Sequence, residues 1–158
     1  MKDVFAFDVD GTLTATRQRI SQDFEQFLRS FVSTETVYLV TGSVYSKISE
    51  QLPADIMESC NGVFTCSGAE LWQNGRIVYC KTHNFPEKLV ELVEHFIDTS
   101  AYPVRCGTHI EPRPGMLNIS SVGRQANLAQ RKAYHVWDQT HQERKAFVDA
   151  LLLEFPQY

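Results

Sequence analysis

The chain has 158 residues, of which 43% are hydrophobic and 22% are charged, and its formal net charge is −4. This composition is ordinary for a globular protein, and the net negative charge argues against a nucleic-acid partner. The longest apolar run, residues 148–153, is far too short to cross a membrane, and no secretory segment precedes the first apolar run. The four cysteines lack CxxC spacing, which favours reduced thiols, so we expect a cytoplasmic protein without membrane attachment.

The first 60 residues alternate between short apolar runs and amphipathic stretches. Residues 3–7 and 36–40 are rich in the apolar and β-branched side chains of buried strands. Apolar residues repeat at helical spacing over 24–32, and again over 44–52 up to Pro53. This order predicts a β-α-β-α unit, the start of a doubly wound parallel sheet.

After about residue 60 the pattern changes to short strands joined by turns. Strand-like runs occupy 63–67 and 70–73, and Asn74-Gly75 then leads into a third run at 76–81. Asn-Gly between two such runs is the typical signal of a type I′ hairpin. We therefore expect antiparallel strands in this part of the chain.

The remaining sequence predicts helices and one further hairpin. Apolar residues at helical spacing follow Pro86, and two strand-like runs flank a Pro-Gly turn. This second half has the pattern of an α+β lobe, so we place a domain boundary near residue 60. The predicted elements are a helix from Pro86, strands at 104–113 and 116–120, and helices opening at Asn127 and Thr140.

The segment Asp8-Val9-Asp10-Gly11-Thr12 directly follows the first predicted strand. Ligands of open α/β sheets bind outside the carboxyl ends of the strands, so Asp8 and Asp10 lie where a site is expected. Two nearby carboxylates can hold Mg²⁺, and they offer a nucleophile, Asp8, and an acid/base group, Asp10. The Gly11-Thr12 turn offers N–H groups to phosphate oxygens. Strand-end aspartate pairs also serve as calcium-type ligands or turn caps, but the full DxDGT pattern resembles the signature of haloacid-dehalogenase-like phosphotransferases.

Thr41 ends the second predicted strand, where that superfamily places a Ser or Thr that binds the phosphoryl group. A helix N-cap is the other reading of this segment, and Ser43 could equally supply it. Lys47 lies inside the following predicted helix and is interpreted as a solvated face residue.

Three arginines in the second lobe, Arg113, Arg124 and Arg131, are suited to an anionic group if they converge, because arginine binds phosphate in a bidentate way. Spacing alone favours three exposed charges instead. His109 and Glu111 alternate on a predicted strand and could be metal ligands, although ordinary side-chain roles are favoured.

Three segments resemble the eukaryotic-type phosphomannomutases, and the similarity extends over essentially the whole chain. They are residues 8–18, residues 43–52 (SVYSKISEQL) and residues 105–124 (RCGTHIEPRPGMLNISSVGR), followed by Arg131 at the next matching arginine. The resemblance implies a partial, doubly wound haloacid-dehalogenase-like core at 1–60 and an inserted α+β cap with an antiparallel sheet at 61–158.

The resemblance also implies an activity and a set of site residues. In this family a phospho-aspartate, here Asp8, carries the phosphoryl group between positions of a mannose or glucose phosphate, and Asp10 moves the proton. Mg²⁺ binds the Asp8 carboxylate and the Asp10 backbone carbonyl, and a hexose 1,6-bisphosphate activator keeps Asp8 phosphorylated. The residues matching the sugar-phosphate ligands are Arg17, Arg113, Arg124 and Arg131.

Departures from the family pattern leave rival functions open. Thr41 replaces a glycine, which is more typical of the superfamily's phosphatases, and Ser67-Gly68 stands where Asn-Gly is expected. The family's last third, with an acidic metal-binding loop and a lysine, has no counterpart, so we expect weak catalysis. A sugar-phosphate phosphatase and a non-catalytic sugar-phosphate-binding module are the alternatives. Two core strands make a poor sheet, so the chain could be a fragment or the product of a gene truncation, or a second copy could complete its core. Of these, self-association as a homodimer is the state we expect.

Overall fold

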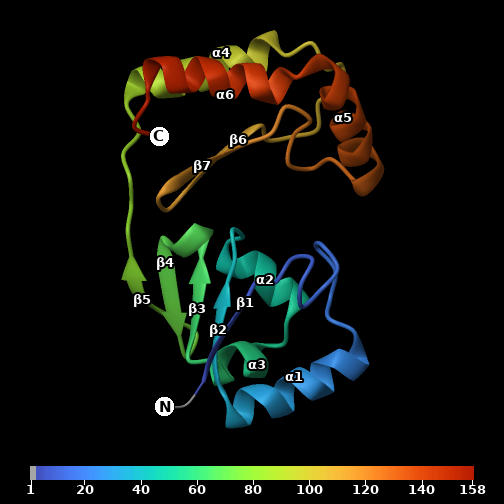
Figure 1. The fold of residues 1–158 in the computed structure, drawn as a ribbon, viewed down its shortest axis with the longest axis vertical. Helices are drawn as coiled ribbons and strands as arrows, with labels where there is room; N and C mark the ends of the chain where they lie inside the picture. The colour runs from blue at the N-terminus through green and yellow to red at the C-terminus, as the bar shows by residue number, and fades with distance from the viewer. Residues whose placement is uncertain (1–2) are drawn as a thin grey trace. The chain divides into compact units, whose positions relative to one another are not determined.

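The first half of the chain is organised around one sheet. In the computed structural model, which describes residues 3–158, strands β1 (Val4–Phe7), β2 (Thr36–Val40) and β3 (Gly62–Thr65) pair in parallel. Strands β4 (Glu70–Gln73) and β5 (Arg76–Cys80) extend the sheet in antiparallel fashion, in the order β1-β2-β3-β4-β5 (Figure 1). The mixed α/β class expected from the sequence is confirmed.

The turn between β4 and β5 has the predicted type. Asn74 and Gly75 have φ angles of 49° and 70°, and Gln73 pairs with Arg76 across the two-residue loop. Positive φ at both central residues is the requirement of a type I′ turn, which matches the twist of the flanking strands. The predicted hairpin is therefore confirmed.

Three helices connect the parallel strands: α1 (Gln22–Thr34), α2 (Tyr45–Gln51) and α3 (Ala54–Ser59). The sequence predicted α1 and α2, but it treated Pro53 only as the end of a helix. Pro53 is also the N-cap of α3. Proline is favoured at helix starts, where its missing N–H costs no hydrogen bond.

The helices bury their apolar faces against the strands in one core. Each helix contributes residues that are nearly inaccessible to solvent, and β2 and β3 supply the opposing side chains. The core residues with the largest fully buried side chains are Val9, Leu28, Val37, Leu39, Ile48, Leu52, Ile56 and Val63.

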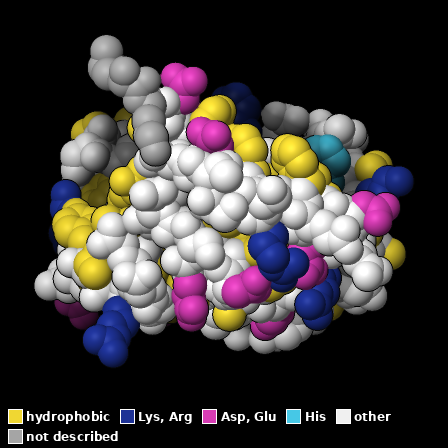
Figure 2. Space-filling model, turned by 90° about the horizontal axis from the view of Figure 1, so that it is seen from below, with side chains coloured by type: hydrophobic (Ala, Val, Ile, Leu, Met, Phe, Trp, Pro, Cys, Tyr) yellow, Lys and Arg dark blue, Asp and Glu magenta, His cyan; other side chains and the backbone are white. Residues whose placement is uncertain are grey.

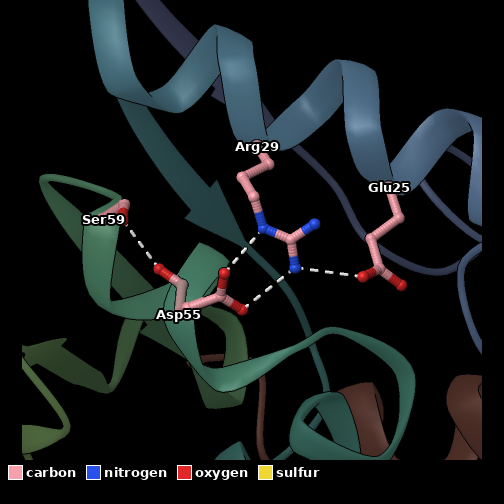
Figure 3. Close-up of polar contacts among 4 residues, drawn as sticks. All are labelled: Glu25, Arg29, Asp55 and Ser59. Atoms are coloured by element: carbon pink, nitrogen blue, oxygen red, sulfur yellow. Dashed lines mark hydrogen bonds and ion pairs between the residues drawn. The ribbon is translucent and has the colours of Figure 1, made fainter.

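A polar contact on the surface joins α1 to α3 (Figure 3). Arg29 donates from Nε to Asp55 Oδ2 at 2.7 Å and from Nη2 to Glu25 Oε1 at 3.0 Å, while Ser59 Oγ donates to the Asp55 carbonyl at 2.7 Å. Arg29 and Asp55 are well exposed, so water and salt screen this ion pair and it adds little stability. The apolar core, rather than this ion pair, holds the two helices in place.

The chain forms two units. The first runs to His83 and includes the short segment Arg113–Met116, and the second comprises Asn84–Pro112 and Leu117–Tyr158. These limits differ from the boundary expected near residue 60, because β3 pairs in parallel with β2 and so joins the first sheet. A functional division into core and cap at that residue stays a prediction.

The second unit contains three helices and most of a two-stranded hairpin, whose turn segment Arg113–Met116 belongs to the first unit. The helices are α4 (Glu87–Thr99), α5 (Leu128–His141) and α6 (Glu143–Glu154), and the hairpin strands are β6 (Ile110–Arg113) and β7 (Met116–Ile119). Within residues 3–158 no helix has the length and apolar character needed to cross a bilayer.

Two predictions for this half differ from the structure. The strand expected at 104–113 begins only at Ile110, because Gly107 has a φ of 70° and Cys106 N–H bonds to the Val122 carbonyl in an irregular loop. The helix start expected at Thr140 is wrong. Helix α5 runs through that residue, and Gln142, in the left-handed region at φ 53°, separates it from α6.

Candidate active site

Two carboxylates follow β1 at the carboxyl end of the parallel strands. Asp8 is exposed and Asp10 is partly buried, while Val9 between them is 0% exposed and points into the core. The two carboxylates therefore flank a core residue directly after the strand end. Asp8 Oδ1 accepts a hydrogen bond from the Val9 N–H at 2.8 Å, which orients the exposed carboxylate.

The turn that follows Asp10 uses its own N–H groups. Gly11 N–H donates to the Thr14 carbonyl at 2.7 Å, and Thr12 N–H donates to the Val9 carbonyl at 3.3 Å. The Leu13 and Thr14 N–H groups also donate to the Val9 carbonyl. The expectation that Gly11 and Thr12 offer free N–H groups to phosphate is therefore wrong, because the turn consumes these donors.

The Asp10 carboxylate is the most heavily hydrogen-bonded group of the site. Its Oδ1 accepts from the Arg17 N–H and from Gln51 Nε2, each at 2.8 Å, and its Oδ2 accepts from Ser43 Oγ at 3.2 Å. Partial burial raises the pKa of Asp10, but hydrogen bonds from Arg17, Gln51 and Ser43 and the Arg17 charge together outweigh burial and lower the pKa. Asp10 is consequently a carboxylate near neutral pH.

Thr41 and Ser43 lie in the loop that ends β2. Thr41 is 3% exposed, and its Oγ1 accepts a hydrogen bond from the Ser43 N–H at 3.1 Å. The N-cap position of α2 is Val44, so neither hydroxyl caps the helix. The N-cap interpretation is wrong, and the phosphate-binding role of Thr41 stays a prediction. Lys47 pairs with Glu50 on the exposed face of α2, as expected for a solvated residue.

The loop after β3 completes this edge of the sheet. Cys66, Ser67 and Gly68 have φ angles of 50°, 56° and 90°, an unusual left-handed run for two non-glycine residues. The Ser67 N–H donates to the Thr41 carbonyl at 3.0 Å, and the Cys66 N–H donates to the Ser43 carbonyl at 3.0 Å. Three consecutive parallel strands therefore end in loops that are joined by hydrogen bonds.

Two of the expected arginines belong with these loops. The Arg17 N–H is bonded to Asp10, and the Arg17 side chain is exposed. Arg113 is counted with the first unit, where its Nη1 donates to the Gly42 carbonyl at 3.0 Å.

The other two arginines meet in the second unit. Arg131 donates from Nη2 to the Arg124 carbonyl at 2.5 Å and from Nε to the Ala126 carbonyl at 2.8 Å. Arg124 Nε lies 2.9 Å from Glu111 Oε2. The Arg131 guanidinium thus binds backbone carbonyls, including that of Arg124, whereas the Arg124 guanidinium pairs with a carboxylate.

His109 and Glu111 have ordinary roles. His109 Nδ1 lies 2.8 Å from the Ser120 carbonyl, and Glu111 accepts a hydrogen bond from Asn118 in addition to its contact with Arg124. Within residues 3–158 no three His, Cys, Asp or Glu side chains form a metal-binding group. The Asp8–Asp10 loop itself offers the exposed Asp8 carboxylate and backbone carbonyl oxygens as oxygen ligands.

Gln51 is a site residue that sequence reasoning missed. It lies on α2 on the same face as Ile48, and it is 4% exposed. A polar side chain on the apolar face of an amphipathic helix needs a buried partner. That pattern was readable in the sequence, but the identity of the partner, Asp10, required the fold.

Comparisons with known proteins point to one family. Residues 24–158 match the family model for eukaryotic phosphomannomutase. A phosphomannomutase of Dendrobium officinale is 35% identical over 158 residues and covers 96% of this chain, and phosphomannomutase 1 of Mus musculus is 38% identical over 157 residues and covers 94%. The chain spans 63% and 60% of the length of these two curated relatives.

Solved structures agree at the level of the fold. An IMP-nucleotidase of Plasmodium falciparum is 9% identical with a TM-score of 0.56, covering 98% of this chain and 47% of that one. A sugar phosphatase of haloacid-dehalogenase subclass IIB is 19% identical with a TM-score of 0.50, covering 83% of this chain and 47% of that one. At these identities the likeness supports the haloacid-dehalogenase-like fold and nothing finer.

Proposed function

The chain belongs to the eukaryotic phosphomannomutase family, and from that premise we propose that it is a phosphotransferase acting on hexose phosphates through a phospho-aspartate at Asp8. The observation that carries the proposal is the pair of carboxylates after β1. Asp8 is exposed and accessible to substrate, whereas Asp10 is held as an ionised base by three donors.

The chemistry needs one nucleophile and one proton carrier. When phospho-Asp8 gives its phosphoryl group to a sugar hydroxyl, a P–O bond forms to the sugar oxygen and the bond to Asp8 breaks. The hydroxyl proton passes to the Asp10 carboxylate. In the reverse half, Asp8 attacks the other phosphate of the bisphosphate, and protonated Asp10 returns the proton to the leaving sugar oxygen. The lowered pKa of Asp10 suits the first half, which begins with an ionised base.

The residues present fit Mg²⁺. This ion prefers oxygen ligands, retains several waters and is commonly bound by one or two carboxylates together with substrate phosphate. The Asp8 carboxylate and the Asp10 carbonyl would hold it, and bound Mg²⁺ would neutralise charge on the transferring phosphoryl group. A hexose 1,6-bisphosphate is the proposed activator that phosphorylates Asp8.

We assign the sugar phosphate, of mannose or glucose, to the family's four matching arginines. The pairing of Arg124 with Glu111 predicts that substrate must displace or share that carboxylate. A homodimer and a cytoplasmic location complete the proposal, and the four free cysteines agree with a reducing compartment. The assigned substrate-binding residues are Arg17, Arg113, Arg124 and Arg131.

Peptide mapping after incubation with glucose 1,6-bisphosphate and Mg²⁺ tests the proposal. Phosphate should appear on Asp8, and Asp8→Asn should abolish it, whereas Asp23→Asn, at an exposed position of α1, should leave it intact. Label that survives Asp8→Asn would refute the assignment. Release of inorganic phosphate without hexose phosphate isomerisation would favour the phosphatase alternative, to which Thr41 is suited.

A further inference from the structure

Gln51 makes two hydrogen bonds that tie α2 to the loop after β1. Its Nε2 donates to Asp10 Oδ1 at 2.8 Å and to Thr14 Oγ1 at 3.2 Å. Its backbone carbonyl accepts from the Ile20 N–H at 2.9 Å. Both amide hydrogens are therefore used, and one residue anchors the loop near its beginning and at its end.

The surroundings fix which end of the amide faces Asp10. An Asp10 carboxylate that accepts from Arg17 and Ser43 requires a donor from Gln51 as well. Thr14 Oγ1 donates its own hydrogen to the Val9 carbonyl at 3.3 Å, so it accepts from Gln51. Only a group with two hydrogens on one atom satisfies both neighbours. Neither an apolar nor an acidic side chain can replace this arrangement.

The two oxygens of Asp10 are occupied unequally. Oδ1 accepts two hydrogen bonds of 2.8 Å, from the Arg17 N–H and from Gln51, whereas Oδ2 accepts one longer bond of 3.2 Å from Ser43. The saturated Oδ1 anchors the carboxylate, and Oδ2 retains capacity to exchange a proton. An anchored carboxylate keeps its reactive oxygen in one direction, which favours proton transfer.

We propose that Gln51 is a positioning residue for proton transfer by Asp10: it holds Oδ1 so that Oδ2 exchanges the proton with the sugar oxygen. This inference rests on the proposed phosphotransferase function. Gln51 itself touches no reacting atom, so its effect should appear only in steps in which Asp10 moves a proton.

Two phosphoryl donors distinguish a step that needs a proton from Asp10 from one that does not. Transfer from glucose 1,6-bisphosphate to Asp8 releases a sugar oxygen that takes a proton from Asp10, whereas transfer from acetyl phosphate releases acetate, which needs none. Gln51→Met keeps the side-chain length but removes both donors. It should slow phosphorylation of Asp8 by the bisphosphate at least tenfold, since positioned proton transfer contributes roughly 10²–10⁴-fold. Phosphorylation by acetyl phosphate should change less than about twofold.

Asp10→Asn provides the matched control. It should show the full loss with the bisphosphate, and adding Gln51→Met to it should cause little further loss, because both changes act through one group. Equal slowing with both donors would mean that Gln51 is merely structural, and would overturn the proposal. So would an unchanged bisphosphate rate. If Gln51→Met does not fold, Gln51→Leu is measured in the same way.

A second readout is independent of activity. In the metal-free chain, the side-chain amide hydrogens of Gln51 should exchange with solvent much more slowly than those of an exposed glutamine such as Gln26 on α1, as followed by NMR. Free exchange at Gln51 would overturn the inference. If neither donor phosphorylates Asp8 in the unmodified chain, the proposed function fails, and slow exchange would still support the Gln51–Asp10 anchor.

Discussion

At the scale of single residues, the four cysteine thiols differ in their exposure to solvent. Cys60 lies in the core of the first unit, and burial raises its pKa to about 11, while Cys80 is exposed on β5. The thiolate is the reactive form, so near pH 8 only on the order of a thousandth of Cys60 is reactive.

We therefore expect iodoacetamide to alkylate Cys80 at least about 100 times faster than Cys60 in the folded chain. Mass spectrometry of the digested peptides over time measures both rates. Unfolding in guanidinium should bring the two rates together. Comparable rates in the folded state would contradict the buried position of Cys60.

Gly123 is fixed by a close backbone approach. Its φ is +89°, and a Cβ at this position would lie 2.1 Å from the Cys106 carbonyl oxygen, whose bond to Gln125 N–H belongs to the same loop. Gly68 has a similar φ of +90° but nothing within 4 Å. A side chain at Gly68 would therefore meet backbone strain alone, whereas one at Gly123 would also overlap with the Cys106 backbone.

Gly68→Ala should cost about 1–2 kcal/mol of unfolding free energy, the usual penalty of a left-handed residue with a Cβ. Gly123→Ala should cost roughly 1–3 kcal/mol more, because the loop around Cys106 must also move. Urea unfolding followed by circular dichroism compares them. Equal losses would mean that the loop yields freely.

At the residue scale the sequence predicted that Asp8 and Asp10 follow a strand, but not the residues that hydrogen-bond to them. Asp8 and Asp10 were readable because their pattern follows a strand directly. Gln51 was not, since its partner lies 41 positions away in sequence. Hydrogen bonding within the Gly11-Thr12 turn was also unpredicted, because it depends on backbone angles that many residue types permit.

At the scale of elements, two helix starts with similar sequence signals differ in their capping. Asn127 Oδ1 accepts from the Gln130 N–H at 2.9 Å, and Gln130 Oε1 accepts from the Asn127 N–H at 2.8 Å, which forms a capping box for α5. Ser21 occupies the N-cap position of α1 but makes no side-chain cap hydrogen bond.

Asn127→Ala should therefore destabilise the chain by about 1 kcal/mol, while Ser21→Ala should change the unfolding free energy by less than about 0.5 kcal/mol. Denaturant titration gives both values, and amide exchange in the first turn of α5 should accelerate only in Asn127→Ala. An effect of Ser21→Ala as large as that of Asn127→Ala would show that the caps do not differ as described.

Sequence patterns predicted helices and turns correctly where residues close in the sequence determine the backbone conformation. The Asn74-Gly75 hairpin and the helices with apolar stripes are examples. The continuation of α5 past Thr140 was missed because a threonine followed by glutamate resembles a cap, while the actual break is a left-handed glutamine at 142. The division into units also escaped prediction, because the pairing of β3 with β2 is a long-range contact.

At the scale of the whole molecule, the sheet has two edge strands of different character. Strand β1 carries no charged residue from Val4 to Phe7, although Asp3 and Asp8 flank it, and Val4 is 64% exposed. Strand β5, at the other edge, begins with Arg76 and is followed by Lys81. Charged residues within an edge strand discourage edge-to-edge pairing, so β1 is the edge more prone to pair with a strand of another copy. Figure 2 shows hydrophobic side chains at the surface between charged ones on one face.

We expect the chain to self-associate through β1, in line with the proposed homodimer. Sedimentation velocity over a range of concentrations should show a species heavier than the 18.1 kDa monomer. Val4→Lys should shift the equilibrium toward monomer, because a charge on an exposed edge opposes strand pairing. Val78→Lys on β5, where the valine is 54% exposed, is the matched control and should leave association unchanged.

A monomer at about 100 μM, far above the range in which specific interfaces form, would contradict association altogether. A loss of association only in Val78→Lys would assign it to the opposite edge, and would show that apolar exposure outweighs the flanking charges there.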